Sequence, residues 1–371
     1  MGSAAAWQLA RRGARVLCLE RFDIPHAMGS SHGVTRIIRM PYYEDPRYVP
    51  LLRRAYQLWR EIEAVSGERL LVTTGSIDAG PEDGELFQGA LASARQHQLE
   101  HEVLTGAQIA RRFPAYHLPR VHRGVFQPDG GFVVSELAIV AHVRAAQSQG
   151  AEIHARERVV SWEPGGSQRI SVVTDRAVYR ARQLILTAGA WVGELAAVLK
   201  PIAIPERQVL AWLQPRRPEL FEPSRFPVFN LAVEEGRYYG LPVFQVPGFK
   251  FGRYHHRGES VPNPDELRRE PDAEDERILR QFAQRYFPDG CGPTMALRTC
   301  MFTNTPDEHF IIDRHPEYPQ VIVASPCSGH GYKFCSVIGE ILAEMAINGE
   351  SRHQIDFLRL SRNGLANHAG P

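Results

Sequence analysis

The chain has 371 residues, of which 43% are hydrophobic and 23% charged, and its formal net charge at pH 7 is +1. This length exceeds the usual size of a single hydrophobic core, so we expect two domains. The near-zero charge gives no electrostatic basis for a nucleic-acid partner, and no apolar run approaches the ~18 residues of a membrane span.

The N-terminal pattern is typical of part of a nucleotide-binding unit. Residues 2–12 predict a helix, and residues 14–20 predict an apolar strand ending at Glu20. In a dinucleotide-binding βαβ unit, an acid ~20 residues after the glycine-rich turn holds the ribose hydroxyls. Gly2 stands where the third glycine of that turn is expected, so the first strand is missing. Because that strand is normally central, we expect about a dozen upstream residues to supply it.

The middle of the chain changes from helices to strands. The apolar stripe of residues 47–65 predicts an amphipathic helix, and residues 135–148 predict a second one. The segment from Val159 to Arg180 contains three short strands, separated by Gly165-Gly166 and Asp175-Arg176, and predicts a meander. Residues 184–191 then predict a buried parallel strand whose small-residue end, at Gly189, meets a ligand.

Residues 200–300 indicate a different layer, because prolines, aromatic residues and alternating strands dominate there. One amphipathic helix is predicted in this layer, from Asp275 to Phe287. The chain then returns to α/β character, with a strand over residues 321–324 and a glycine-containing turn over 328–331. A final helix is predicted over residues 334–347.

Lysine and cysteine usage are both informative. Lysine occurs only at Lys200, Lys250 and Lys333 among 43 basic residues. Such a lysine is a candidate for a position that needs a compact ammonium, although it can also be a leftover of an arginine-rich composition. The five cysteines form no CxxC pair, which argues against a disulfide scaffold and structural zinc. We therefore predict a reducing, cytoplasmic location and no metal site.

The first segment that contains candidate catalytic or binding residues is GSSHGVTRIIR, residues 29–39. Its spacing allows His32, Arg36 and Arg39 to converge on one side. Cations there can stabilise the negative charge of a hydride-reduced flavin, or hold an amino-acid carboxylate, which arginine binds bidentately. The alternative is a solvated basic loop.

Two further segments contain the remaining candidates. SGHGYKF places Lys333 among glycines directly before a predicted helix, whose N-terminus adds positive potential. The other segment contains Tyr239, Lys250 and His255. A desolvated lysine at a flavin can stabilise charge as oxygen accepts an electron. The alternative for SGHGYKF is a turn that serves only packing, and the alternative for Lys250 is a surface lysine. Cys300, taken alone, is most simply a small buried hydrophobe.

Together these segments resemble the monomeric sarcosine oxidase family, which includes N-methyltryptophan oxidase and peroxisomal pipecolate oxidase. The resemblance covers nearly the whole chain and is carried, in this order, by GSSHGVTRIIR, LRTCMF, PDEHFIID and SGHGYKF. It implies an α/β fold with a Rossmann-like FAD-binding domain, lacking its first strand here, and a mixed-sheet α+β substrate domain. We expect the first domain from residues 1–70, 131–202 and 307–371, and the second from 71–130 and 203–306.

The resemblance also implies residue roles. Cys300 corresponds to the cysteine joined to the flavin by a thioether, and Lys250 to the oxygen-activating lysine. Arg39 and Lys333 match the pair that holds the substrate carboxylate, while His32 and Arg36 match residues beside the flavin ring. Tyr239 and His255 complete the predicted catalytic set. His255 is matched although this chain has one extra residue between Lys250 and the histidine pair. The predicted FAD contacts are Gly2, Glu20, Gly29, Ser30, Val159, Gly189, Cys300, Gly329 and Gly331.

The implied reaction is oxidation of an N-methyl or other secondary amino acid by oxygen, giving an imine that hydrolyses, and hydrogen peroxide. Sarcosine and N-methyltryptophan are the model substrates. Phe302 stands where some family members have tyrosine, which leaves the preferred side chain open. We expect a monomer whose partners are an N-alkyl amino acid and oxygen. The alternatives are a pipecolate-like cyclic imino-acid oxidase, a flavin dehydrogenase and, because of the missing strand, a flavin-free binding protein.

Overall fold

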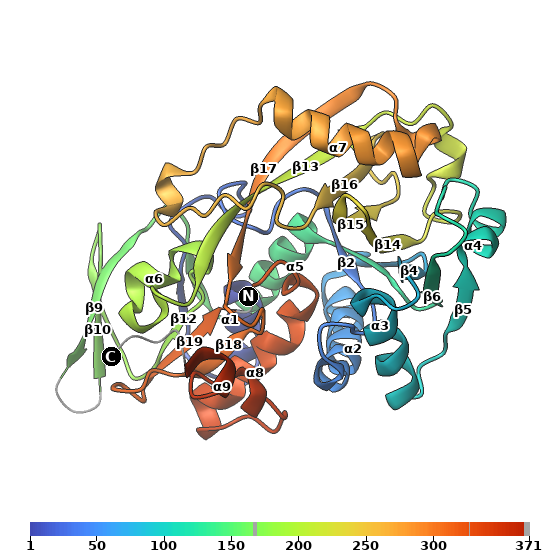
Figure 1. Cartoon of the computed structure of the whole chain (residues 1–371). Coiled ribbons are helices and arrows are strands. Elements are labelled where there is room, and N and C mark those ends of the chain that lie inside the picture. Colours follow the sequence, from blue (N-terminus) through green and yellow to red (C-terminus); the bar gives the residue numbers. More distant parts are fainter. Residues whose placement is uncertain (166–168, 326, 367–371) are drawn as a thin grey trace.

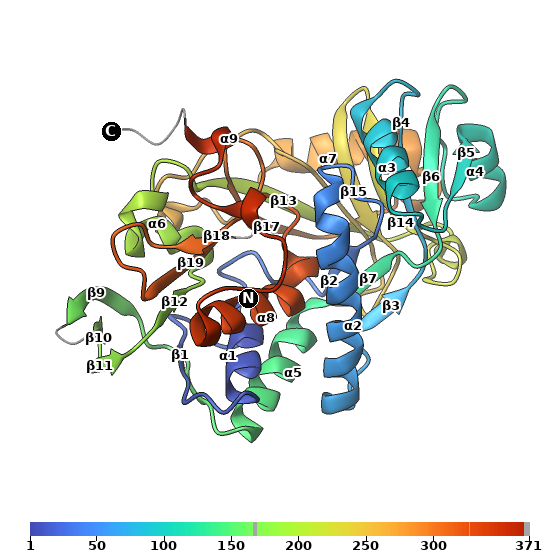
Figure 2. The same cartoon turned by 90° about the horizontal axis from the view of Figure 1, so that it is seen from below.

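The computed structural model describes residues 1–165, 169–325 and 327–366. Figure 1 shows a layer of helices and short sheets around the N-terminus, and above it a large sheet covered by α7 (Ala273–Tyr286). Figure 2 shows the helical layer from below. In the described residues, no helix is both long and apolar enough to cross a membrane.

Four helices form the core of the lower layer. They are α1 (Gly2–Ala10), α2 (Val49–Ser66), α5 (Ser135–Ser148) and α8 (Cys335–Asn348). Helix α1 packs against α5 and α8, so its small residues lie between two neighbours. A side chain at Gly339 of α8 would meet the backbone of Ala4 at 2.6 Å. Glycine is therefore required there for the two helices to approach this closely.

Parallel pairs of short strands flank α1. Strand β1 (Leu17–Leu19) pairs with β8 (Glu152–His154), and β12 (Leu184–Leu186) pairs with β19 (Val321–Ser325). Strand β18 (Ile311–Arg314) completes the second sheet as an antiparallel neighbour of β19. Among the described residues, no strand pairs with the other edge of β1 or of β12, and both strands line one cavity. The sheet that was predicted to bind a nucleotide is thus divided into two parts.

The predicted meander is confirmed. Strands β9 (Val159–Gly165), β10 (Arg169–Thr174) and β11 (Val178–Ala181) form an antiparallel three-stranded sheet. Gly166, half of the predicted first turn, lies outside the described residues. The chain continues into the short helix α6 (Val192–Leu195), and α9 (Asn363–Ala366) lies near the C-terminus.

The upper layer is one mixed sheet of eight strands. Its middle contains β14 (Val228–Val233), parallel to β4 (Ser76–Gly80), while the other neighbours are antiparallel. In spatial order the remaining strands are β17 (Thr294–Asn304), β13 (Ile204–Leu213), β16 (Phe249–Arg253) and β15 (Gly236–Leu241) on one side, and β6 (Arg123–Gln127) and β5 (Glu102–Thr105) on the other. Aromatic side chains pack between this sheet and α7, with the rings of Tyr238 and Phe282 stacked 3.8 Å apart.

A small sheet joins the two layers. It consists of β2 (Thr35–Ile38), β7 (Gly131–Val134) and β3 (Leu71–Thr73), with β7 in the centre. Two outer helices, α3 (Glu85–Gln96) and α4 (Gly106–Arg112), pack on the end of the large sheet. The predicted division into two domains at the stated boundaries stays a prediction.

Candidate functional site

A cavity of about 1550 Å³ lies between the two layers. Its wall combines the start of α1 and the ends of β1 and β12 with residues of the eight-stranded sheet. Most of the residues predicted from the sequence line it: Gly2, Glu20, Gly29, Ser30, Arg36, Arg39, Val159, Gly189, Tyr239, Lys250, Cys300, Gly329, Gly331 and Lys333. The volume exceeds the ~300–1,000 Å³ of a drug-sized ligand site, and part of it is the gap between β1 and β12.

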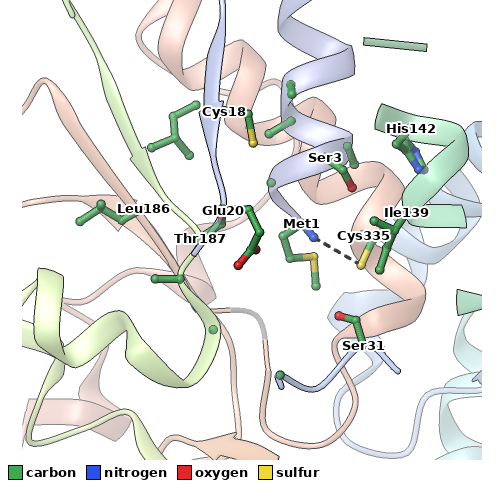
Figure 3. Close-up of a pocket in the computed structure, with 18 of the residues that line it drawn as sticks. Met1, Ser3, Cys18, Glu20, Ser31, Ile139, His142, Leu186, Thr187 and Cys335 are labelled. Carbon is green, nitrogen blue, oxygen red and sulfur yellow. Dashed lines mark hydrogen bonds between the residues drawn. The ribbon is translucent and has the colours of Figure 1, made fainter. Parts of the chain in front are cut away.

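One part of the cavity has the features of a nucleotide site. Figure 3 shows Glu20, which follows β1, Thr187, which follows β12, and Met1, at the start of α1, among the residues that line this part of the cavity. Glu20 Oε1 accepts a hydrogen bond from the Phe22 amide at 2.9 Å, which fixes its carboxylate at the strand end. The N-terminus of α1 also borders this part, and helix N-termini favour phosphate groups.

The loop before β2 and strand β17 meet in the middle of the cavity wall. Arg36 donates hydrogen bonds to the main-chain oxygens of Ser30, at 2.7 Å, and Thr35, at 2.9 Å. Cys300 is 5% exposed, and its Sγ lies 3.9 Å from the Ser30 oxygen. Gly329 has φ = +74°, and a side chain there would meet the Phe302 ring at 2.6 Å. Glycine is therefore required there, both for the left-handed backbone and for close packing against the Phe302 ring.

These residues fit the FAD that the sequence resemblance implies. The wall offers an acid at a strand end, a helix N-terminus, a glycine with a left-handed backbone and a thiol, all around one long cavity. Glu20 would hold the ribose, and Cys300 is the one residue of the predicted set able to form a thioether.

Lys250, on β16, is 2% exposed. Its Nζ donates hydrogen bonds to the main-chain oxygens of Gly33, at 2.7 Å, and Thr35, at 2.6 Å. Burial and the nearby Arg36 hold the pKa of Lys250 well below its ordinary value. Such a group loses its proton more readily than a surface lysine. The structure thus places this rare lysine in the cavity wall and not at the surface, and its role there stays a prediction.

Arg39, which follows β2, is 1% exposed and makes several polar contacts. Its guanidinium donates to both carboxylate oxygens of Glu44, at 2.9 and 2.8 Å, and to the Pro41 oxygen at 2.6 Å. Its Nε lies 3.4 Å from Asp78 Oδ1. The predicted carboxylate-binding arginine therefore lies at the cavity already paired with two carboxylates, which the sequence did not indicate.

Lys333, in the turn before α8, is held near Arg39 at the same wall. Its Nζ donates to the His330 main-chain oxygen at 2.7 Å and lies 3.4 Å from the Tyr42 hydroxyl. Tyr42 in turn lies 2.6 Å from His330 Nδ1. Burial, followed by the charge of Arg39, lowers the pKa of Lys333 to about 7. Near neutral pH this side chain therefore exists in both protonation states.

The sequence pattern did not indicate three polar residues of this region: Asn230, which lines the cavity, and Glu44 and Asp78, which lie behind the wall. The Nδ2 of Asn230 donates to Asp78 Oδ1 at 2.8 Å. The Tyr254 hydroxyl donates to Asn230 Oδ1 at 3.2 Å. The available signal was the lone carboxylate of Asp78 in the otherwise uncharged segment Ser76–Gly80, since a buried strand seldom contains an acid without a partner.

His32 and His255 are not among the residues that line the cavity. His32 is buried, and burial followed by the charge of Arg36 lowers its pKa to about 4, so its ring is neutral. His255 lies at the surface between two carboxylates, 2.8 Å from Glu206 and 3.2 Å from Glu308. The structure thus brings together Arg36, Arg39 and Lys250 but places both histidines outside the wall.

Comparisons with known proteins agree with this geometry. A family model described as FAD dependent oxidoreductase matches residues 1–345. The chain is 37% identical over 375 residues to monomeric sarcosine oxidase of Bacillus sp. (strain NS-129), covering 100% of this chain and 96% of the relative. It is 35% identical over 366 residues to N-methyl-L-tryptophan oxidase of Yersinia pestis (strain Pestoides F), with 98% and 96% covered. Human peroxisomal sarcosine oxidase is 32% identical over 366 residues, with 97% and 93% covered.

Solved structures confirm the fold class. The open form of NikD, an unusual amino acid oxidase, superposes with a TM-score of 0.84 at 24% identity, covering 96% of this chain and 94% of that one. L-proline dehydrogenase from P. horikoshii superposes with a TM-score of 0.82 at 19% identity, covering 96% and 93%. The predicted α/β architecture, a nucleotide-binding domain with a mixed-sheet substrate domain, is therefore correct.

Proposed function

We propose the reaction of this chain from the premise that it belongs to the FAD dependent oxidoreductase family and is an FAD-dependent amine or amino-acid oxidase related to the sarcosine oxidases. It oxidises the CH–NH bond of an N-methyl or other secondary amino acid, of the sarcosine or N-methyltryptophan kind. The imine that forms hydrolyses, and oxygen is reduced to hydrogen peroxide. Family membership also argues against the alternative of a flavin-free binding protein.

One observation carries this proposal: two buried cations, Arg39 and Lys333, lie at the wall of the cavity that also contains Cys300 and Lys250. An amino-acid carboxylate is the ligand group that a buried arginine and lysine recognise together. Held there, the substrate presents its amine and α-carbon to the middle of the cavity. Fixing this geometry supplies much of the rate, because bound reactants no longer lose orientational freedom in the transition state.

Bound FAD would accept the hydride that leaves the CH–NH bond and pass two electrons to oxygen. In its protonated form, Lys250 supplies positive charge where oxygen becomes negative, since its Nζ is fixed by Gly33 and Thr35 in a water-poor wall. Arg36, held by Ser30 and Thr35, adds a second cation to the same wall. Tyr239 borders the cavity near them and limits the space for the substrate.

The chain would hold FAD along the cavity with the residues predicted from the sequence. Glu20 would bind the ribose, the start of α1 at Gly2 the pyrophosphate, and Cys300 the isoalloxazine ring through a thioether. The remaining contacts would come from the backbone and small side chains that line the same wall: Gly29, Ser30, Val159, Gly189, Gly329 and Gly331.

Measuring hydrogen peroxide with sarcosine, N-methyltryptophan and pipecolate as separate substrates tests the proposal. Peroxide with an N-methyl amino acid supports it, and a preference for pipecolate favours the cyclic imino-acid alternative. Oxidation with an artificial electron acceptor but without peroxide would identify a dehydrogenase. Phe302, which borders the cavity, is the first residue to vary if large side chains are preferred. A monomer in the cytoplasm stays a prediction.

A further inference from the structure

Four charged side chains are gathered in the wall and directly behind it at the proposed carboxylate site. Arg39 and Lys333 are the cations, and Glu44 and Asp78 are the anions. All four side chains are largely shielded from water: Arg39 and Asp78 are each 1% exposed and Lys333 is 6% exposed, and the side chain of Glu44 is 7% exposed. With all four ionised, the group has no net charge.

A substrate bound with its amine neutral, the form whose lone pair assists hydride departure, brings only its carboxylate charge and changes this balance. That carboxylate would be the third anion beside two cations, and the surplus negative charge would lie in a wall that water does not reach. Burying an uncompensated charge is costly, and a titratable group in such a place takes up a proton instead. Binding of the substrate is therefore favoured if one of the two carboxylates of the group becomes neutral.

The geometry distinguishes the two carboxylates. Glu44 receives two hydrogen bonds from Arg39, and although burial raises its pKa, the charges of Arg39 and its neighbours bring it down to about 2. Asp78 has only the Nε of Arg39 at 3.4 Å, without hydrogen-bond geometry, and the amide of Asn230 at 2.8 Å. Burial raises the pKa of Asp78 to about 6. Asp78 is thus the easier of the two to protonate.

The elements packed around Asp78 bring few other titratable groups. Arg39 and Glu44 face it from the segment after β2, Lys333 from the turn before α8, and the Tyr254 hydroxyl through Asn230. Strand β6 places the apolar Val125 opposite Asp78. The residues of α3 that pack on Val125 are apolar as well. Burial raises the pKa of Tyr254 to about 12, so it stays neutral. Lys333 is the one other group here that exchanges a proton near neutral pH.

We propose that Asp78 is a positioning residue that carries a proton whenever a carboxylate substrate is bound at Arg39 and Lys333. The inference rests on the proposed function, because it assumes that this wall receives the substrate carboxylate. Protonation removes the negative charge beside Arg39 Nε, so that the arginine is balanced by Glu44 and Lys333 by the ligand. Where Asp78 is ionised before binding, the binding step therefore consumes one proton at Asp78. Any proton that Lys333 takes up is additional.

The test is isothermal titration calorimetry of the FAD-loaded protein with methoxyacetate, a carboxylate that has an ether in place of the oxidisable amine. Titrations at about pH 5.5 and about pH 8, each in buffers of different ionisation enthalpy, give the Kd and the number of protons taken up. From about pH 5.5 to about pH 8, the ratio of the wild-type Kd to the Kd of Asp78→Asn should rise by up to ~100-fold. The reason is that each pH unit above the pKa of Asp78 weakens binding to the wild type, but not to the variant, by a factor of ten. At the higher pH the variant should take up about one proton fewer.

Glu44→Gln tests the charge balance itself, since it removes the other carboxylate of the group. The ligand is then only the second anion beside two cations, so Asp78 can stay ionised, and this variant should also take up about one proton fewer than wild type at about pH 8. Wild-type protein alone is also informative, in case Asp78→Asn does not fold. Uptake of about two protons at about pH 8 supports the inference, because Lys333 supplies a site for only one. Uptake of one or fewer overturns it.

The two proposals fail separately. If methoxyacetate does not bind wild-type protein at either pH, the carboxylate site itself is wrong. If it binds, but the ratio of the two Kd values does not change with pH, only the role of Asp78 is refuted.

Discussion

Lys250 and Thr35 lie 215 positions apart, and the Nζ of Lys250 donates a hydrogen bond to the main-chain oxygen of Thr35 at 2.6 Å. This bond joins β16 of the eight-stranded sheet to the start of β2. Lys250 also donates to the Thr35 hydroxyl at 3.2 Å and to the Gly33 oxygen at 2.7 Å. The ammonium is therefore fixed at the cavity wall, and it cannot follow a ligand as a surface lysine would.

Replacing Lys250 by methionine should slow the reaction with oxygen by roughly 100-fold, while reduction of the flavin by substrate changes much less. The reason is that the positive charge helps only the step in which oxygen becomes negative. Stopped-flow absorbance measures both half-reactions separately. Lys200→Met is the control, because Lys200 is exposed and outside the cavity. Equal slowing of both half-reactions would show that Lys250 has a different role.

Lys333→Met and Arg39→Ala should each weaken binding of a carboxylate ligand by roughly 2–5 kcal/mol, since a buried charge would lose its partner. Arg39→Ala should also lower the free energy of unfolding by roughly 3–5 kcal/mol, because Glu44 and Asp78 would lose their shared cation. Equilibrium titration and chemical denaturation measure the two effects. Arg47→Ala, at a site where the side chain is 55% exposed, should change neither. An unchanged Kd in Lys333→Met would contradict the assignment.

Flavin should remain attached to the protein through Cys300. After acid precipitation of the wild-type holoenzyme, the yellow colour should stay in the pellet, and in Cys300→Ser it should move to the supernatant. Cys291→Ser is the matched control, because Cys291 is equally buried but lies in the core of the upper layer. Release of all flavin from wild-type protein would make Cys300 a packing residue.

The stability of the protein should depend on pH through His255. Hydrogen bonds to Glu206 and Glu308 raise the pKa of this histidine to about 9. Because the pKa is raised, the contribution of His255 to the free energy of unfolding is fully present below its pKa in the unfolded chain, ~6.5. This contribution is lost as the pH rises through about 9. Because the side chain is 43% exposed, the effect should be below about 1 kcal/mol.

Thermal unfolding at several pH values measures this effect. The Tm of wild-type protein should fall more between about pH 6.5 and about pH 9.5 than that of His255→Asn. His101→Asn serves as the control, since the His101 ring contacts the Leu99 main-chain oxygen rather than a carboxylate. Identical pH profiles for wild type and His255→Asn would mean that the ion pairs contribute nothing measurable.

The sequence by itself determined several of the longer helices of this fold. Helix α5 begins and ends as its pattern predicted, at Ser135 and Ser148, and α2 and α8 differ by one or two residues. Helical periodicity is a local property, so it survives without knowledge of neighbours. Strand β1 is shorter than predicted, Leu17–Leu19 instead of residues 14–20, because a strand extends only as far as its partner, β8, pairs with it.

The segments of the candidate site were also evident from the sequence, because a rare lysine or a glycine-rich turn can be recognised without knowledge of the fold. Which of their residues face the cavity was decided by the tertiary structure: Arg36 and Lys250 do, while His32 does not. The same holds for the partners of Arg39. Asp78 and Asn230 belong to strands β4 and β14, which are neighbours only in the folded sheet. Electrostatic pairing depends on distance in space and on exclusion of water, and neither is encoded in the local pattern.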